Sequence, residues 1–129
     1  MFSSERKLAI AEYKKLYQII GSVECPYFVG EKVFFNRKGF NHLLRRGKTP
    51  RFSAEQDERL ALLKYCKNML SIGHDYVEYR TVEKLDTAAF FWTFTARFEN
   101  LNIKLVVRQI DNGQKHSFSI FPITHERPR

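Results

Sequence analysis

Apolar residues in the first half of the chain recur at the three- and four-residue spacing of an amphipathic helix. The clearest case covers residues 4–20, where lysines separate the apolar positions. These positions are Ile10, Tyr13, Tyr17 and Ile20. Gly21 follows and predicts the end of this helix. The short apolar run Val33–Phe35 then predicts a strand or an extended entry into the next element.

A second, shorter helix is predicted over residues 38–46. Its apolar positions would face inward and leave the polar ones toward solvent or a cleft. The inward set is Phe40, Leu43 and Leu44, and the outward set is His42, Arg45 and Arg46. Gly47 ends this helix, and residues 48–51 form a basic linker.

A third helix is predicted to open at Ser53 and to run to about Leu70. Ser53 at the N-cap and Gln56 at the third helical position match a capping box, in which each side chain satisfies a backbone donor of the other. Cys66 falls among the apolar positions of this helix and is expected in the core. Cys25 and Cys66 form no metal-binding motif, so we expect a reduced, cytoplasmic setting.

The second half of the chain changes to the two-residue period of strands. Strands are predicted over residues 76–80, 90–98, 102–110 and 115–121. Short turns join them, including Asp111–Gly113. The expected fold is α+β, with N-terminal helices packed on one face of a four-stranded antiparallel meander. The 129 residues suit a single domain. It comprises an N-terminal helix (1–21), a helical part (33–72) and the sheet (76–122).

The net charge of the chain indicates what kind of partner it binds. The chain carries 22 Lys and Arg against 14 Asp and Glu, a formal net charge of +8. Such a field attracts polyanions, so RNA or another nucleic acid is the expected partner. No apolar run reaches the length of a membrane span, and the cations are not gathered on one amphipathic helix, so we expect no membrane partner.

The period of two assigns residues to the two faces of the predicted sheet. In the third strand, Lys104 and Arg108 alternate with an apolar set that would face the helices. In the last strand, Lys115, Ser117 and Ser119 share one face. These five residues are predicted to line an exposed surface suited to phosphate. His116 lies at the mouth of the hairpin, where a bulge could turn it to either face.

His42 is the candidate for proton transfer. An imidazole and the guanidinium of Arg45 or Arg46 would share one helical face. Metal-independent RNA cleavage needs a base for the 2′-hydroxyl, an acid for the leaving 5′-oxygen and cations on the phosphate. Histidine suits either proton role, and arginine suits the phosphate. Acidic residues are scattered, so neither a metal nor another cofactor is expected.

Each of these features also has a plainer interpretation. His42 fits a surface helix residue without a role, the basic run a solvated face, and the serines ordinary solvent-facing positions. The aromatic run Phe90–Phe94 is more typical of a core than of a base-stacking platform. Its alternation still leaves Phe91 or Trp92 able to reach the open face.

Three segments together resemble a known family. These are Phe34–Arg45, Val106–Ile110 and Gly113–Ile120. They resemble small bacterial and phage proteins of the barnase–EndoU–colicin–RelE ribonuclease superfamily, and the order of helices before an antiparallel sheet is similar too. The resemblance implies a toxin-like ribonuclease that cuts RNA, such as tRNA, without metal through a 2′,3′-cyclic phosphate.

The resemblance also implies roles for individual residues. It makes His42 the general base or acid, and gives the opposite proton role to His116 or Lys115. Arg45, Arg108 and Lys115 would hold the phosphate, and Ser117 and Ser119 would donate hydrogen bonds to it. Two other functions remain open. One is a non-catalytic nucleic-acid-binding module, and the other is an interaction protein with an acidic partner. An acidic antitoxin or immunity protein would also fit the ribonuclease.

Overall fold

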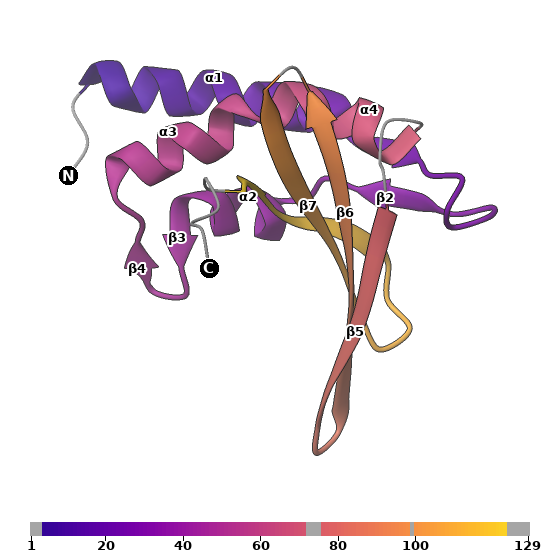
Figure 1. Cartoon of the computed structure of the whole chain (residues 1–129). Helices are drawn as coiled ribbons and strands as arrows, with labels where there is room; N and C mark the ends of the chain where they lie inside the picture. Colours follow the sequence, from indigo (N-terminus) through magenta and orange to yellow (C-terminus); the bar gives the residue numbers. More distant parts are fainter. Residues whose placement is uncertain (1–3, 72–75, 99, 124–129) are drawn as a thin grey trace, which may run out of the picture.

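The computed structural model describes residues 4–71, 76–98 and 100–123, and within these ranges the protein is α+β. Helices lie against a mixed six-stranded sheet with the strand order β1-β2-β8-β7-β6-β5 (Figure 1). The helical segments are α1 (Ser4–Ile20), α2 (Arg37–Leu44), α3 (Ser53–Ala61), the 3-10 turn η1 (Leu63–Tyr65) and α4 (Cys66–Ser71). The sheet strands are β1 (Ser22–Glu24), β2 (Lys32–Phe34), β5 (Tyr76–Lys84), β6 (Thr87–Phe98), β7 (Leu101–Ile110) and β8 (Lys115–Pro122). A separate two-stranded hairpin consists of β3 (Arg45–Arg46) and β4 (Thr49–Pro50).

The four-stranded antiparallel meander describes only part of this sheet. Strands β5 to β8 are antiparallel neighbours, as predicted. The prediction is wrong in stopping there, because β2 pairs in parallel with β8 and β1 pairs with β2. Each of these two added strands has three residues, too few for a two-residue period to be visible.

The helix predicted over residues 4–20 is confirmed. The helix predicted over residues 38–46 is also present, but its predicted C-terminal end is wrong. Helix α1 stops at Ile20, and Gly21 follows with φ +64. Helix α2 is capped by the Asn36 side chain, which accepts a hydrogen bond from the Gly39 amide at 3.0 Å. It ends at Leu44, and Arg45 is extended. Arg45 and Arg46 therefore belong to strand β3 instead of the helix that carries His42.

The predicted capping box is also wrong. Helix α3 begins at Ser53, so its N-cap residue is Phe52. The Gln56 side chain is fully buried and donates to the carbonyl of Leu44 at 2.8 Å, which ties α3 to the end of α2. The long third helix is divided into α3, η1 and α4, and this change of direction brings α4 against β1 and β6.

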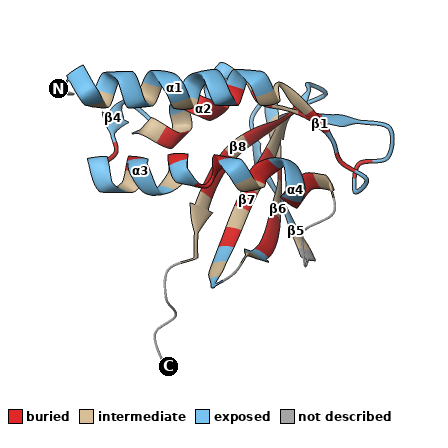
Figure 2. Cartoon of the chain, turned by 90° about the horizontal axis from the view of Figure 1, so that it is seen from above, coloured by how far each residue is buried: buried red, intermediate tan, exposed pale blue. Residues whose placement is uncertain are grey.

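The hydrophobic core lies between these helices and one face of the sheet. Figure 2 shows the buried positions concentrated there. From the strands come Phe94, Ala96, Ile103, Leu105, Val107 and Ile120, and from α3, η1 and α4 come Leu60, Leu63, Cys66, Met69 and Leu70. Burying each large side chain contributes roughly 1.5–3 kcal/mol before entropy is considered. The predicted helix-facing set of β7 is thereby confirmed, and the other face of the sheet remains available for a site. In the part of the chain that the structure covers, no helix is long and apolar enough to cross a membrane.

Candidate active site

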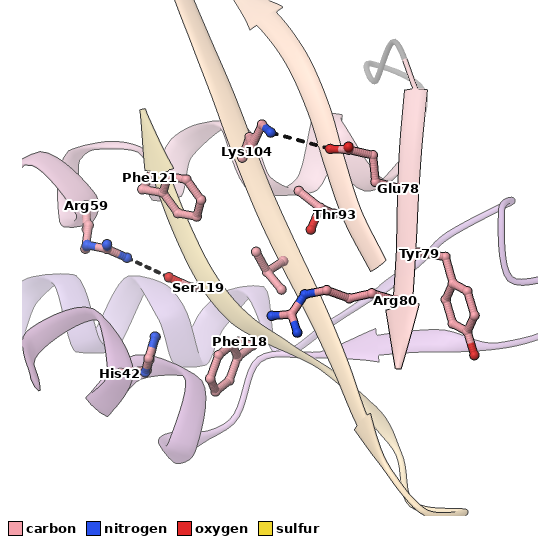
Figure 3. Close-up of a pocket in the computed structure, with 11 residues that line it drawn as sticks. His42, Arg59, Glu78, Tyr79, Arg80, Thr93, Lys104, Phe118, Ser119 and Phe121 are labelled. Carbon is pink, nitrogen blue, oxygen red and sulfur yellow. Dashed lines mark hydrogen bonds and ion pairs between the residues drawn. The ribbon is translucent and has the colours of Figure 1, made fainter. Parts of the chain in front are cut away.

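A cavity of about 510 Å³ lies on the open face of the sheet. Helices α2 and α3 border one side, β5 borders the other, and β6 to β8 form the floor (Figure 3). We call it the cationic pocket and define it by His42, Arg59, Arg80, Lys104, Phe118 and Ser119. These residues come from segments far apart in the sequence, so only the fold brings them together.

A bulge in β8 determines which residues face this pocket. Ser119 pairs with Val106, but Ser117 pairs with Val107, so Phe118 is an extra residue in β8. His116 pairs with Arg108 and therefore lies on the open face, as Ser119 does. Ser117 is turned to the covered face. The expectation that Lys115, Ser117 and Ser119 share one face is consequently wrong, and only Ser119 lies at the pocket.

His42 sits on α2 with its ring stacked on Phe118, the two centroids 4.1 Å apart. Arg51 holds it from the other direction. The Arg51 Nε donates to the His42 carbonyl at 2.9 Å, and its Nη2 lies 3.2 Å from His42 Nε2. A guanidinium can only donate, so Nε2 is the acceptor and the neutral ring carries its proton on Nδ1. The imidazole is thus fixed with its basic nitrogen facing a cation.

The charge state of His42 follows from this setting. Burial is the largest cause that lowers its pKa, from 6.5 to about 4, and four guanidinium groups lower it further. In order of effect these belong to Arg51, Arg59, Arg108 and Arg46. His42 is therefore neutral at physiological pH and able to accept a proton.

Arg51 and Arg59 form a largely buried pair of cations. Their side chains are 3% and 12% exposed, and both contact Glu55 Oε2, at 2.8 and 3.4 Å. Arg46 lies 3.7 Å from the same oxygen. One carboxylate is thus shared by three guanidiniums, which leaves excess positive charge beside the pocket. Arg59 also donates to Ser119 Oγ at 2.6 Å, and its buried Nε has no hydrogen-bond partner among the described residues.

A second arginine–histidine pair, Arg108 and His116, extends the site along the sheet. The Arg108 guanidinium lies over the Phe118 ring, 4.2 Å from its centroid, and its Nε donates to His116 Nε2 at 3.2 Å. Burial, and then the charge of Arg108, lower the pKa of His116. Phe118 therefore connects the two imidazoles, since His42 stacks on it and Arg108 joins it to His116.

The floor and the β5 side of the pocket each add one more cation. Lys104 Nζ lies 3.4 Å from Glu78 Oε1, in a pair exposed to solvent. The Arg80 guanidinium covers the ring of Phe91, 4.2 Å from its centroid. Figure 3 shows Arg80 and Lys104 on the opposite side of the pocket from Arg59 and His42. A bound anion would therefore be enclosed by cations from both sides.

The structure brings together most, but not all, of the residues predicted for the site. Placed in or beside the pocket are His42, Arg46, Lys104, Arg108, His116 and Ser119. Arg45 points along the β3–β4 hairpin, where its guanidinium donates to the Lys48 carbonyl. Lys115 is on the covered face, 8% exposed, with Nζ 2.5 Å from Glu31 and close to the rings of Phe28 and Trp92.

Sequence reasoning missed Arg51, Arg59, Arg80 and Phe118. Arg59 occupies a position in the apolar pattern of its helix, and a charged residue there is a signal for a buried functional group. Glu55, four residues after Arg51 and four before Arg59, offers a matching i,i+4 partner for both. Phe91 lies on the open face under Arg80, whereas Phe94 belongs to the core, as its aromatic run predicts.

Within residues 4–71, 76–98 and 100–123, no three His, Cys, Asp or Glu side chains gather in an arrangement that could hold a metal ion. Comparison of the chain with protein-family models, with curated proteins and with solved structures finds no match. Function is therefore inferred from the geometry of the cationic pocket.

Proposed function

We propose that the chain is a toxin-type endoribonuclease that cleaves RNA by attack of a 2′-hydroxyl on the neighbouring phosphate, without a metal ion. One observation carries the proposal: a neutral imidazole, His42, stands among guanidinium groups at the edge of an open cavity. The imidazole supplies a base, and the cations match the charge that accumulates on the phosphorane.

In the proposed reaction His42 is the general base. Its Nε2 accepts the proton of the 2′-hydroxyl when that group takes the place now held by Arg51 Nη2. The 2′-oxygen forms a bond to phosphorus, and the bond from phosphorus to the 5′-oxygen breaks. A phosphodiester beside Arg51 and Arg59 also offsets their field, which raises the pKa of His42 toward its ordinary value and makes it a stronger base in the complex.

The remaining cations of the site bind the phosphate and supply the second proton. Arg59 and Ser119 are already hydrogen-bonded to each other and are placed to bind the non-bridging oxygens. Lys104 lines the pocket and carries a transferable proton, so we assign it to the leaving 5′-oxygen. Arg108 adds charge behind Phe118, and His116 holds its guanidinium in place. The products are a 2′,3′-cyclic phosphate and a 5′-hydroxyl.

The test is cleavage of single-stranded RNA by the purified chain in EDTA. Replacing His42 with Gln removes the base but keeps a planar polar side chain, so the cleavage rate should fall about 10²–10⁴-fold. DNA of the same sequence should remain intact because it lacks the 2′-hydroxyl. Lys14→Gln, on the exposed part of α1, is the control. Thermal unfolding checks that each variant folds.

Three results would contradict the ribonuclease. Cleavage by His42→Gln at the wild-type rate would remove the base from the mechanism. A gel shift without products would favour a binding module, and neither binding nor cleavage would favour an interaction protein. In cells, expression should arrest growth and His42→Gln should relieve the arrest. An acidic antitoxin or immunity protein would fit this pocket by inserting carboxylates between Arg59 and Arg80.

A further inference from the structure

Phe52 is a large aromatic side chain that is 86% exposed. It occupies the N-cap position of α3, where serine, threonine, aspartate and asparagine stabilise a helix by accepting a hydrogen bond from its first amides. A phenyl ring can accept no such bond, and at this exposure it adds almost nothing to the core. Phe52 thus departs from the N-cap preference without adding to the stability of the fold, which is typical of a functional position.

Phe52 follows the β3–β4 hairpin, whose exposed side chains are strongly basic. The hairpin turns at Gly47, which has φ +62, and exposes Arg45, Arg46 and Lys48. Its base is held firmly, since the Arg51 amide donates to the Leu44 carbonyl at 2.8 Å. The ring and the cations are therefore presented on a fixed support.

This hairpin adjoins the cationic pocket. It begins three residues after His42, and Arg51, which holds the His42 ring, immediately precedes Phe52. Arg46 is close enough to lower the pKa of His42 and to lie 3.7 Å from Glu55 Oε2. The hairpin therefore lies beside the edge of the pocket that carries His42.

We propose that Phe52, Arg45, Arg46 and Lys48 form a stacking platform that binds an unpaired nucleotide of RNA next to the cationic pocket. The inference rests on the proposed ribonuclease function and adds a substrate class to it, namely a single strand or a loop. An aromatic face stacks on any unstacked base, while the cations hold the adjacent phosphates. In a duplex the bases stack on each other, so Phe52 has no base to contact. A single exposed ring next to a basic hairpin suits RNA better than an apolar protein surface.

The experiment measures binding without cleavage. The probe is a 2′-O-methyl RNA strand, which cannot undergo attack by a 2′-hydroxyl, alone or annealed into a duplex. Phe52→Ser removes the ring and adds a good N-cap, so Tm should rise by a few degrees while affinity for the single strand falls roughly 5- to 150-fold. Phe52→Trp should retain the affinity. Ile19→Ser, which truncates another exposed apolar residue, is the matched control and should change neither.

The dependence of RNA affinity on salt distinguishes the contribution of the Phe52 ring from that of the basic side chains. Phe52→Ser should leave the slope of log affinity against log salt unchanged, whereas Arg46→Gln or Lys48→Gln should each reduce it by about 0.7. Wild-type affinity of Phe52→Ser for the single strand would overturn the platform, as would an equal loss on the duplex. If Phe52→Ser no longer binds an acidic protein partner but still binds RNA as wild type does, the stacking platform would be overturned in favour of a protein-binding surface.

The two proposals fail differently. If native RNA is not cleaved but Phe52→Ser weakens single-strand binding, the platform stands and the ribonuclease fails. If RNA is cleaved and Phe52→Ser binds and cleaves as wild type does, the platform alone fails.

Discussion

Lys104 and Lys115 belong to adjacent strands of one hairpin but lie on opposite faces of the sheet. Lys115 is on the covered face, where its ammonium contacts the rings of Phe28 and Trp92 and the carboxylate of Glu31. Lys115 is buried, and its charge is matched by this carboxylate. Lys104 is on the open face, half-buried in the wall of the cavity. The same side chain thus stabilises the fold on one face and is available to a ligand on the other.

The two faces also differ in how their charges balance. On the covered face one cation has one carboxylate. On the open face Lys104 also has a carboxylate, that of Glu78. Beside it, however, Arg46, Arg51 and Arg59 share Glu55, and Arg108 contacts a neutral imidazole. Excess buried charge is costly to a fold unless a ligand of opposite sign completes it. The imbalance is the physical reason to place the function on the open face.

The sharpest way to break this comparison is to remove one charge from each face. Replacing Arg59 with Gln removes the proposed donor to the phosphate, so the cleavage rate should fall about 10²–10³-fold. Lys115→Met removes the same charge from the covered face and should leave the rate of the folded protein unchanged. Single-turnover cleavage of RNA measures both, and equal losses would show that net charge matters more than position.

The next prediction tests the close contact between helix α2 and the bulge in strand β8. A Cβ on Gly39 would lie 2.1 Å from the Ser117 carbonyl oxygen, at the bulge that turns His116 and Ser119 to the open face. Gly39→Ala should therefore destabilise the fold by about 2–3 kcal/mol, although alanine is the better helix former. Chemical unfolding measures the change. Lys38→Ala, at the neighbouring exposed helical position, is the control, and similar values for both would mean that α2 can move away from β8.

A smaller effect is expected for the stability contributed by Lys115. Its side chain is 9% exposed and lies 5.0 Å from the Phe28 ring centroid and 5.2 Å from that of Trp92. Lys115→Met keeps the aliphatic stem but loses the cation, so unfolding free energy should fall by about 1–2 kcal/mol. Lys104→Met, which breaks an exposed ion pair, should change it by less than about 1 kcal/mol. The reverse order, measured by urea unfolding, would refute the structural role of Lys115.

The sequence predicts which face of the sheet a residue lies on only where the two-residue period of a strand is uninterrupted. Strand β7 keeps a strict alternation, and the faces of Lys104 and Arg108 were predictable for that reason. In β8 one extra residue, Phe118, reverses the assignment of every residue before it, and nothing in a local pattern of polar and apolar residues distinguishes this bulge from a regular strand.

The candidate site shows the same division. His42 was predictable because it stands beside apolar helical positions and has chemistry of its own. The sequence places Arg51 only in a basic linker. Its burial depends on the Leu44 carbonyl, His42 and Glu55, which the fold alone brings to it. Strands β1 and β2 are three residues long and owe their pairing to β8. Contacts at long sequence separation leave no periodic signal.

Changes of pH test whether the positive charge of the guanidinium groups acts on His42. A base must be neutral, and the pKa of His42 is lowered to about 4, so kcat/KM, which reports the free enzyme, should stay level as pH falls from 7 to 5 and decline near 4. The decline in kcat should come at higher pH, because bound phosphate offsets the arginines. A decline in kcat/KM near 6.5 would contradict this.

Folding stability gives the same test without RNA. Between pH 6.5 and about 4 the unfolded chain binds a proton at His42 that the folded protein does not, so unfolding free energy should fall as the solution is acidified. His42→Gln removes this group and should flatten the slope. It should not abolish it, because the pKa of His116 is lowered as well and acts in the same direction. Parallel slopes for the two proteins in urea unfolding would mean that His42 titrates normally, and the field of the four arginines would then be screened by solvent at the very residue proposed as the base.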